Sequence, residues 1–330
     1  MRERATRLPT GGRRAGAVTV RLGTRGSALA LAQAGRVRDA IVALGEPCEL
    51  VPVTTVGDVS RASLAQIGGT GVFAGALRSA LAAGEVDLVV HSLKDLPVAP
   101  APGLVVAGVP EREDARDALC ARDGLALADL PAGAVIGTGS PRRHAQLVDR
   151  RADVEVVDLR GNVDSRLARV RDGELDAVVL SWAGLARLGR LDAVTEALPL
   201  DEWPTAAGQG ALAIEVREAD ADPATTIGRV VAALTDPAAR DGAHAERRVL
   251  GRLEAGCAAP IGVASTIGDD DAVLWASVHR PGGGDRIDRR RVVTWAAGGR
   301  AEALDAAADA LADELLAAGA AELAPLGAAS

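Results

Sequence analysis

The same strand–turn–helix pattern occurs twice in this 330-residue chain, in the same order. The segment LGTRGSALALAQ (residues 22–33) resembles IGTGSPRRHAQ (residues 136–146). In each, an apolar strand ends in Gly-Thr, a serine follows, and a glutamine lies six residues beyond that serine. GEVDLVVHS (84–92) and GELDAVVLS (173–181) form a second matched pair. Because such units alternate in α/β folds, the repeat predicts two similar α/β lobes.

The apolar periodicity also places the individual elements. In the first lobe it predicts strands at residues 18–22, 50–56 and 86–91 and helices at 28–44 and 71–83. The C-terminal region has a different pattern, with a helix at 237–253, strands at 261–267, 272–279 and 291–296, and a helix at 301–317. PGGGD (281–285) predicts a hairpin turn. This region is expected to form a small α+β domain.

Cationic side chains stand where strands should end and helices should begin. They are Arg25, Lys94, Arg142, Arg143, Arg160, Arg166 and Arg187. Two facing lobes bind ligands at the carboxyl ends of their strands, and the serines at positions 27 and 140 stand at helix N-caps, where backbone N–H groups attract anions. Arginine matches carboxylate geometry, and the chain has neither a Walker lysine loop nor GxGxxG after its first strand. The pattern therefore favours a ligand with several carboxylates over a phosphate.

Lys94 and Asp95 form an unusual pair, because Lys94 is the only lysine of the chain. A carboxylate in a cationic cleft stays ionised. Asp95 either balances Lys94, or stabilises a cation formed during a reaction, or moves a proton. Cys257 lies on a loop of small residues with arginines upstream, which makes it a candidate for covalent chemistry. The alternative is a small buried side chain.

Composition excludes several classes of protein. A net charge of −8 argues against a general nucleic-acid binder. Three cysteines without a CxxC motif predict neither a zinc site nor a disulfide framework, and they favour reducing cytosol. No apolar stretch is long enough to span a membrane, and no apolar stripe calls for an oligomer, so a monomer is expected. Residues 1–17 are basic without an apolar middle, which favours a disordered extension over a transit peptide.

Seven motifs follow one another along the chain: RLGTRGSALALAQA, HSLKDLP, EREDARDA, GTGSPRR, LRGNVDSRL, AAGQGALAIE and AERRVLGRLEAGCAAPIG. Together they resemble the hydroxymethylbilane synthase family, also called the porphobilinogen deaminases, from residue 18 to the C-terminus. The resemblance implies two periplasmic-binding-protein-like α/β lobes facing a cleft, plus a small C-terminal α+β domain. It implies a discontinuous first lobe at residues 18–112 and 208–232, a second lobe at 113–207 and a third domain at 236–330.

The resemblance also implies a reaction. Members are transferases that join four porphobilinogen molecules head to tail, with loss of ammonia, into hydroxymethylbilane for haem biosynthesis in the cytoplasm. A dipyrromethane cofactor made from substrate would be held by a thioether to Cys257. Asp95 would be the catalytic acid, whose carboxylate meets pyrrole N–H groups and stabilises the cation left when ammonia departs. Lys94 would hold a cofactor carboxylate, and a strand end is expected to aim the two side chains in opposite senses.

Further residues are carried over from the family's motifs. Arg25, Arg142, Arg143, Arg160, Arg166 and Arg187 would hold acetate and propionate groups, with hydrogen bonds from Ser27, Ser92, Thr138 and Ser140. Weaker candidates are Gln33, Phe73 and Gln209. Residues 57–73 would be a mobile segment over the cleft, and many relatives have lysines at the positions of Gln66 and Thr70. Either those lysines are dispensable, or Arg61 substitutes for them, or chain elongation is altered.

Two other functions fit parts of the pattern. A two-lobe protein that binds a small carboxylate reversibly would need the cationic cleft but would give no role to Asp95 or Cys257. A cysteine-dependent hydrolase would need a histidine poised to activate Cys257. None of the four histidines stands in a cysteine-hydrolase motif.

Overall fold

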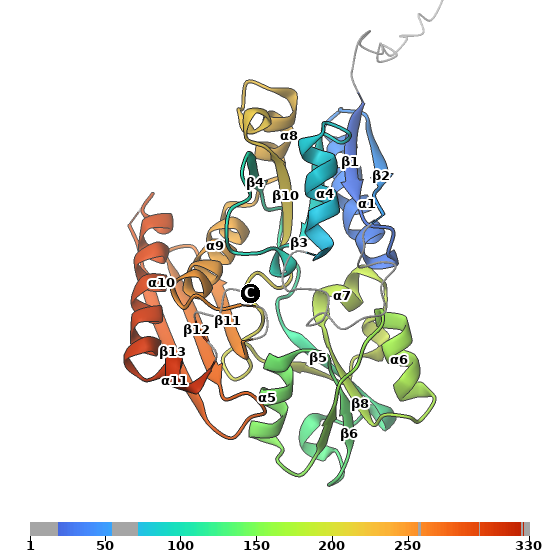
Figure 1. Cartoon of the computed structure of the whole chain (residues 1–330), viewed down its shortest axis with the longest axis vertical. Helices are drawn as coiled ribbons and strands as arrows, with labels where there is room; N and C mark the ends of the chain where they lie inside the picture. Colours follow the sequence, from blue (N-terminus) through green and yellow to red (C-terminus); the bar gives the residue numbers. More distant parts are fainter. Residues whose placement is uncertain (1–18, 55–71, 257–258, 297, 325, 327–330) are drawn as a thin grey trace, which may run out of the picture.

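The structure is a computed structural model that describes residues 19–54, 72–256, 259–296, 298–324 and 326. The described residues form three β-sheets, each with its own helices (Figure 1). We call the parts the first lobe, the second lobe and the third domain, in the order in which the chain enters them. No helix among these residues is long and apolar enough to cross a membrane.

The first lobe contains a five-stranded sheet with the order β2-β1-β3-β10-β4. Its strands are β1 (Val20–Thr24), β2 (Cys48–Pro52), β3 (Leu88–Ser92), β4 (Leu104–Gly108) and β10 (Leu212–Arg217). Its helices are α1 (Ala28–Ala43), α4 (Val72–Ala82) and α8 (Thr226–Leu234). Strand β1 runs parallel to β2 and β3, whereas β10 runs antiparallel to β3 and β4. The chain thus returns to the first lobe with β10, drawn in yellow among its blue and teal strands in Figure 1.

The second lobe repeats this arrangement position by position, with the order β7-β6-β8-β5-β9. Its strands are β5 (Asp117–Ala121), β6 (Val135–Gly137), β7 (Glu155–Val157), β8 (Ala177–Ser181) and β9 (Glu196–Leu198). Its helices are α5 (Pro141–Arg150), α6 (Val163–Arg171) and α7 (Trp182–Arg187). Strand β6 is parallel to β7 and β8, and β5 is antiparallel to β8 and β9. The matching topology confirms the two similar lobes predicted from the sequence repeat.

The third domain packs a three-stranded antiparallel sheet against two long helices. Its elements are α9 (Pro237–Arg252), β11 (Ile261–Ile267), β12 (Asp271–His279), β13 (Arg286–Thr294), α10 (Arg300–Ala317) and α11 (Ala320–Leu323). The predicted hairpin turn is confirmed between β12 and β13, where three consecutive glycines have positive φ values of 87°, 87° and 102°. Only glycine adopts such angles without strain. The predicted α+β domain is therefore confirmed.

The two helix starts named by the repeat are capped as predicted. The Ser27 hydroxyl accepts a hydrogen bond from the Ala30 amide at 3.3 Å, and the Ser140 hydroxyl accepts one from the Arg143 amide at 3.4 Å. Pro141 occupies the first helical position, where its missing N–H costs no hydrogen bond. Each start follows the carboxyl end of a parallel strand, so both helices aim their N-termini at the same side of their sheets.

Candidate active site

A cleft of about 900 Å³ is lined by both lobes. The first lobe contributes the start of α1, the end of β3 and the residues that follow it. The second lobe contributes residues 159–166 and helix α7. These positions lie at the carboxyl ends of parallel strands, where α/β proteins place their ligands.

The cleft collects most of the predicted cations. Six cationic side chains line it, namely Arg25, Lys94, Arg143, Arg160, Arg166 and Arg187. Among the described residues, two carboxylates, Asp95 and Asp164, line it with them. Asp164 is already paired with Arg190 at 2.8 Å outside the group of six. The lining therefore has a surplus of positive charge that suits a ligand with several anionic groups.

Lys94 and Asp95 lie on a single 3-10 turn, Leu93–Asp95, which directly follows β3. Our expectation that strand alternation separates their side chains is therefore wrong. Consecutive residues of a 3-10 helix instead differ in direction by about 120°. Leu93 and Leu96 are each 3% exposed and anchor the turn in the core. The two leucines face inward, and the polar pair between them lines the cleft.

Lys94 is held by one neutral partner. Its ammonium group donates a hydrogen bond to Oε1 of Gln209 at 3.2 Å. Burial lowers the pKa of Lys94 to about 8, against the attraction of Asp95, and the nearby guanidinium of Arg143 lowers it further. A bound carboxylate would relieve both effects, because it supplies a counter-charge to a desolvated cation.

Asp117, the first residue of β5, is a buried hub that sequence reasoning missed. Its carboxylate accepts hydrogen bonds from five side-chain N–H donors. They are Nη2 of Arg142 at 2.9 Å, Nε and Nη2 of Arg143 at 3.1 and 2.6 Å, Nε1 of Trp203 at 2.9 Å and Nε2 of Gln209 at 2.7 Å. Burial alone would raise the pKa of Asp117, but the two arginines hold it well below its usual range. The only sequence signal was its place in EREDARDA, which does not show its partners.

The two neighbouring arginines that bind Asp117 differ in their other contacts. Arg142 is 4% exposed, donates also to Gln146 and to the carbonyl of Pro204, and does not line the cleft. Arg143 does line the cleft. Three of its N–H groups are used by Asp117 and by the Val179 carbonyl, so two of the five remain for a ligand.

Two more second-lobe arginines of the cleft, Arg187 and Arg166, are partly desolvated. Burial lowers the pKa of Arg187 to about 10, and the neighbouring Arg36 adds to this. Nη2 of Arg187 donates to the Gly210 carbonyl at 2.5 Å, whereas its Nε is buried without an acceptor among the described residues. Burial also lowers the pKa of Arg166, with further contributions from Arg143 and Arg160. Like charges held this close together are typical of a site that binds anions.

The other predicted site residues divide into three groups. Ser27, Gln33 and Ser92 line the cleft, and Gln33 Nε2 donates to the Ser92 hydroxyl at 2.9 Å. Thr138, Ser140 and Gln209 do not line it; they cap α5 or orient their neighbours instead. Outside the described residues lie Cys257, Gln66, Thr70 and the side chain of Phe73.

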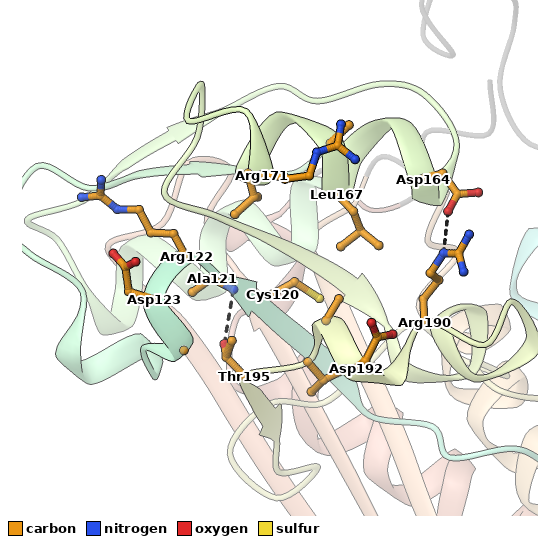
Figure 2. A pocket seen from close by; sticks show the side chains of 15 residues that line it. Cys120, Ala121, Arg122, Asp123, Asp164, Leu167, Arg171, Arg190, Asp192 and Thr195 are labelled. Atoms are coloured by element: carbon orange, nitrogen blue, oxygen red, sulfur yellow. Dashed lines mark hydrogen bonds and ion pairs between the residues drawn. The ribbon is translucent and has the colours of Figure 1, made fainter.

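A second hollow of about 1050 Å³ lies on the second lobe, between α6 and the segment that follows α7 (Figure 2). Its three arginines are each paired with a carboxylate at 2.8–2.9 Å: Arg122 with Asp176, Arg171 with Asp172, and Arg190 with Asp164. This hollow is larger than the cleft but has no surplus charge. It therefore lacks the feature that the sequence predicts for the site. Across the described residues, no group of three or more His, Cys, Asp and Glu side chains could hold a metal ion.

Comparison with known proteins gives one consistent result. Residues 20–225 match the family description "Porphobilinogen deaminase, dipyromethane cofactor binding domain", and residues 242–309 match "Porphobilinogen deaminase, C-terminal domain". A porphobilinogen deaminase of Leifsonia xyli subsp. xyli is 56% identical over 318 residues, covering 95% of this chain and 96% of its own. One from Thermobifida fusca is 52% identical over 276 residues, covering 83% and 85%.

Among solved structures, a periplasmic substrate-binding protein of an ABC transporter from Coxiella burnetii aligns with a TM-score of 0.42. It shares 18% sequence identity and covers 67% of this chain and 94% of its own.

Proposed function

The chain belongs to the porphobilinogen deaminase family, and we propose how the residues of its cleft carry out the family's reaction. It is a transferase that condenses four porphobilinogen molecules head to tail, with release of ammonia, into hydroxymethylbilane. It works with a dipyrromethane cofactor, which supplies the pyrrole end to which the first substrate is joined. The assignment of individual residues below is our proposal.

The surplus of partly buried cations in the cleft is the observation that carries this proposal. Each pyrrole unit bears an acetate and a propionate, so a growing chain is a polycarboxylate. The residues present fit such a group. Lys94 has a pKa lowered to about 8, and Arg187 has a buried Nε without an acceptor among the described residues. A carboxylate would supply the missing charge or acceptor at both places.

Lys94 and Arg143 are proposed to hold carboxylates from opposite walls of the cleft. Both are fixed by the same chain of hydrogen bonds, because Gln209 joins Lys94 to Asp117 and Asp117 holds Arg143. Arg142 binds the same Asp117 carboxylate, and because it does not line the cleft we propose that it does not contact the ligand. Arg25, Arg160, Arg166 and Arg187 line the rest of the cleft and are proposed to bind further acetate and propionate groups.

Asp95 is proposed to be the catalytic residue. Its side chain is solvent-exposed at the cleft lining, on the turn whose leucines are anchored in the core. From there its carboxylate can accept hydrogen bonds from pyrrole N–H groups and stabilise the positive charge that develops when ammonia leaves. Proton transfer by such a group contributes typically 10²–10⁴-fold to a rate, and charge stabilisation adds to it.

Cys257 is proposed as the cofactor attachment site, and the two other cysteines support this by their surroundings. Burial raises the pKa of Cys48 to about 11 and that of Cys120 to about 12. Because the thiolate is the nucleophile, these two thiols are poorly suited to forming a thioether. We also propose the domain limits 18–112 with 208–232, 113–207 and 236–330, and a monomer that acts in the cytoplasm.

Asp95→Asn tests the catalytic assignment. Turnover of porphobilinogen should fall by about 10²-fold or more, while the cofactor stays attached, because the substitution changes charge without changing size. Asp164→Asn is the matched control, since Asp164 also lines the cleft but is paired with Arg190. Its turnover should stay within a few-fold of the parent. Near-normal turnover by purified Asp95→Asn protein would show that another group carries the proton and charge chemistry.

A further inference from the structure

The turn that carries Lys94 and Asp95 is held by a side chain of the third domain. Arg247, on α9, donates from Nη1 to the carbonyls of Leu93 at 3.2 Å and Leu96 at 2.9 Å. Its Nη2 donates to the Pro97 carbonyl at 2.6 Å. One guanidinium therefore binds three backbone carbonyls that bracket Lys94 and Asp95.

Two of these carbonyls, those of Leu96 and Pro97, follow the turn and lie outside its internal hydrogen bonding. Carbonyls at the end of a helix have no partner within it, and Arg247 supplies one to Leu96 and to Pro97. The Leu93 carbonyl also accepts the Leu96 amide at 3.1 Å. The planar guanidinium spans all three acceptors at once, which an ammonium point charge does less well.

The same helix supports the turn through apolar contacts. Ala239 and Ala243 of α9 belong to the buried cluster that contains Leu93 and Leu96. The backbone of Leu93 is tied on its other side to the Ala211 carbonyl at 3.1 Å. The inward side of the turn is thus fixed by α9 and the chain beside β10, and its polar side chains are left to line the cleft.

Helix α9 also leads directly to the proposed cofactor site. It ends at Arg252, five positions before Cys257 in the sequence. The neighbour of Arg247, Glu246, is fully buried and binds Arg112 and the Gly208 amide. The helix is therefore held firmly against the turn that carries Lys94 and Asp95, and the chain that follows its last residue reaches Cys257 five positions later.

We propose that Arg247 is a positioning residue that sets the Lys94–Asp95 turn relative to the cofactor attached at Cys257. This inference rests on the proposed roles of Asp95 and Cys257. Arg247 touches neither substrate nor cofactor in this role. It acts through the backbone of the turn, so that the carboxylate of Asp95 keeps one distance from the reacting pyrrole. Misplacement of a catalytic group by about 1 Å can cost on the order of 10²-fold in rate.

Arg247→Ala, with Arg248→Ala as its matched control, tests this inference. Arg248 is the next residue on the same helix, and it pairs with Asp305 and Asp309 of α10, away from the turn. In Arg247→Ala holoenzyme, kcat should fall by about tenfold or more while KM changes little and the cofactor mass is retained. Arg248→Ala should keep kcat within about twofold of the parent.

A chemical rescue separates positioning from general stability. Guanidinium ion at tens of millimolar should restore several-fold activity to Arg247→Ala, because it can occupy the vacated site on the three carbonyls. It should not help Asp95→Asn. If Arg247→Ala does not fold, Arg247→Lys takes its place: it keeps the charge but not the planar donor set, and its kcat should fall with KM unchanged.

The outcomes distinguish this inference from the proposed function. If Asp95→Asn is inactive but the Arg247 variant has the same kcat as Arg248→Ala, the positioning role is wrong. Arg247 then contributes only to the contact between the third domain and the first lobe. A variant whose KM and cofactor content change in place of kcat would also overturn it. If Asp95→Asn is itself active, the assignment of the catalytic residue fails first.

Discussion

Asp117→Asn should destabilise the second lobe strongly. The carboxylate of Asp117 is fully buried, and it neutralises two arginines that are 4% and 7% exposed. Removing one partner of a buried ion pair typically costs 3–5 kcal/mol, because the other charge stays buried without compensation. Here two guanidinium groups would lose their shared partner. We therefore expect the free energy of unfolding to fall by at least about 3 kcal/mol.

Urea unfolding followed by tryptophan fluorescence measures this effect. The chain has four tryptophans and no tyrosine, and Nε1 of Trp203 donates to Asp117 itself. With a denaturant dependence of about 1–3 kcal/mol per molar urea for a lobe of this size, the midpoint should fall by about 1 M or more. The spectrum of the folded variant should also differ, because the indole loses its charged acceptor.

Asp114→Asn is the control within the same motif. Asp114 pairs with Arg116 at 2.7 Å, but the two side chains are 25% and 39% exposed, and such pairs contribute about 0–1 kcal/mol. The pH dependence gives a second check. Because the pKa of Asp117 is held well below its usual range, its contribution is present above the pKa of an unfolded aspartate and is lost only in strong acid. If the urea midpoint of Asp117→Asn fell no further than that of Asp114→Asn between pH 5 and 8, the proposed stabilising role of Asp117 would be wrong.

Two further predictions concern the cofactor. Burial lowers the pKa of Lys94 to about 8, so in cofactor-free protein its positive charge is present below pH 8 and is lost as the pH rises through that value. Cofactor incorporation, followed by mass, should therefore slow over the same pH range. It should not slow in Lys94→Arg, whose side chain stays charged. Cys257→Ala should fold, take up no cofactor from porphobilinogen and show no turnover, and stable attachment in this variant would move the site to another residue.

The lobes could be predicted from the sequence because their signals are local. A strand that ends in Gly-Thr before a capped helix is encoded within about a dozen residues, and its two copies gave the same topology. The bounds of β13 were less accessible, since we predicted residues 291–296 and the strand is Arg286–Thr294. Its first six residues, RIDRRR, are too polar to indicate a strand. Pairing with β12, such as Val278 opposite Ile287, places it in the sheet.

The site shows the same division between local and long-range information. Placement at strand ends found the six cations of the cleft, but it could not separate Arg142 from Arg143, which are adjacent on α5. Both arginines bind Asp117, and their difference arises from other long-range partners: Arg142 donates to the Pro204 carbonyl, whereas Arg143 donates to the Val179 carbonyl. The hydrogen bonds from Arg247 to the carbonyls beside the Leu93–Asp95 turn join residues about 150 positions apart. The three acceptors are backbone carbonyls, which leave no trace in the amino-acid sequence.

We propose that Cys257 holds a covalent cofactor in a cleft where Asp95 performs the chemistry. The mass of the intact, denatured protein, followed by peptide mapping, tests the attachment at Cys257. We predict an excess equal to one dipyrromethane, located on the peptide that contains Cys257. If the chain is isolated without it, incubation with porphobilinogen or hydroxymethylbilane should add that mass. An unchanged mass after this incubation, or an adduct on Cys48 or Cys120, would show that Cys257 is not the attachment site.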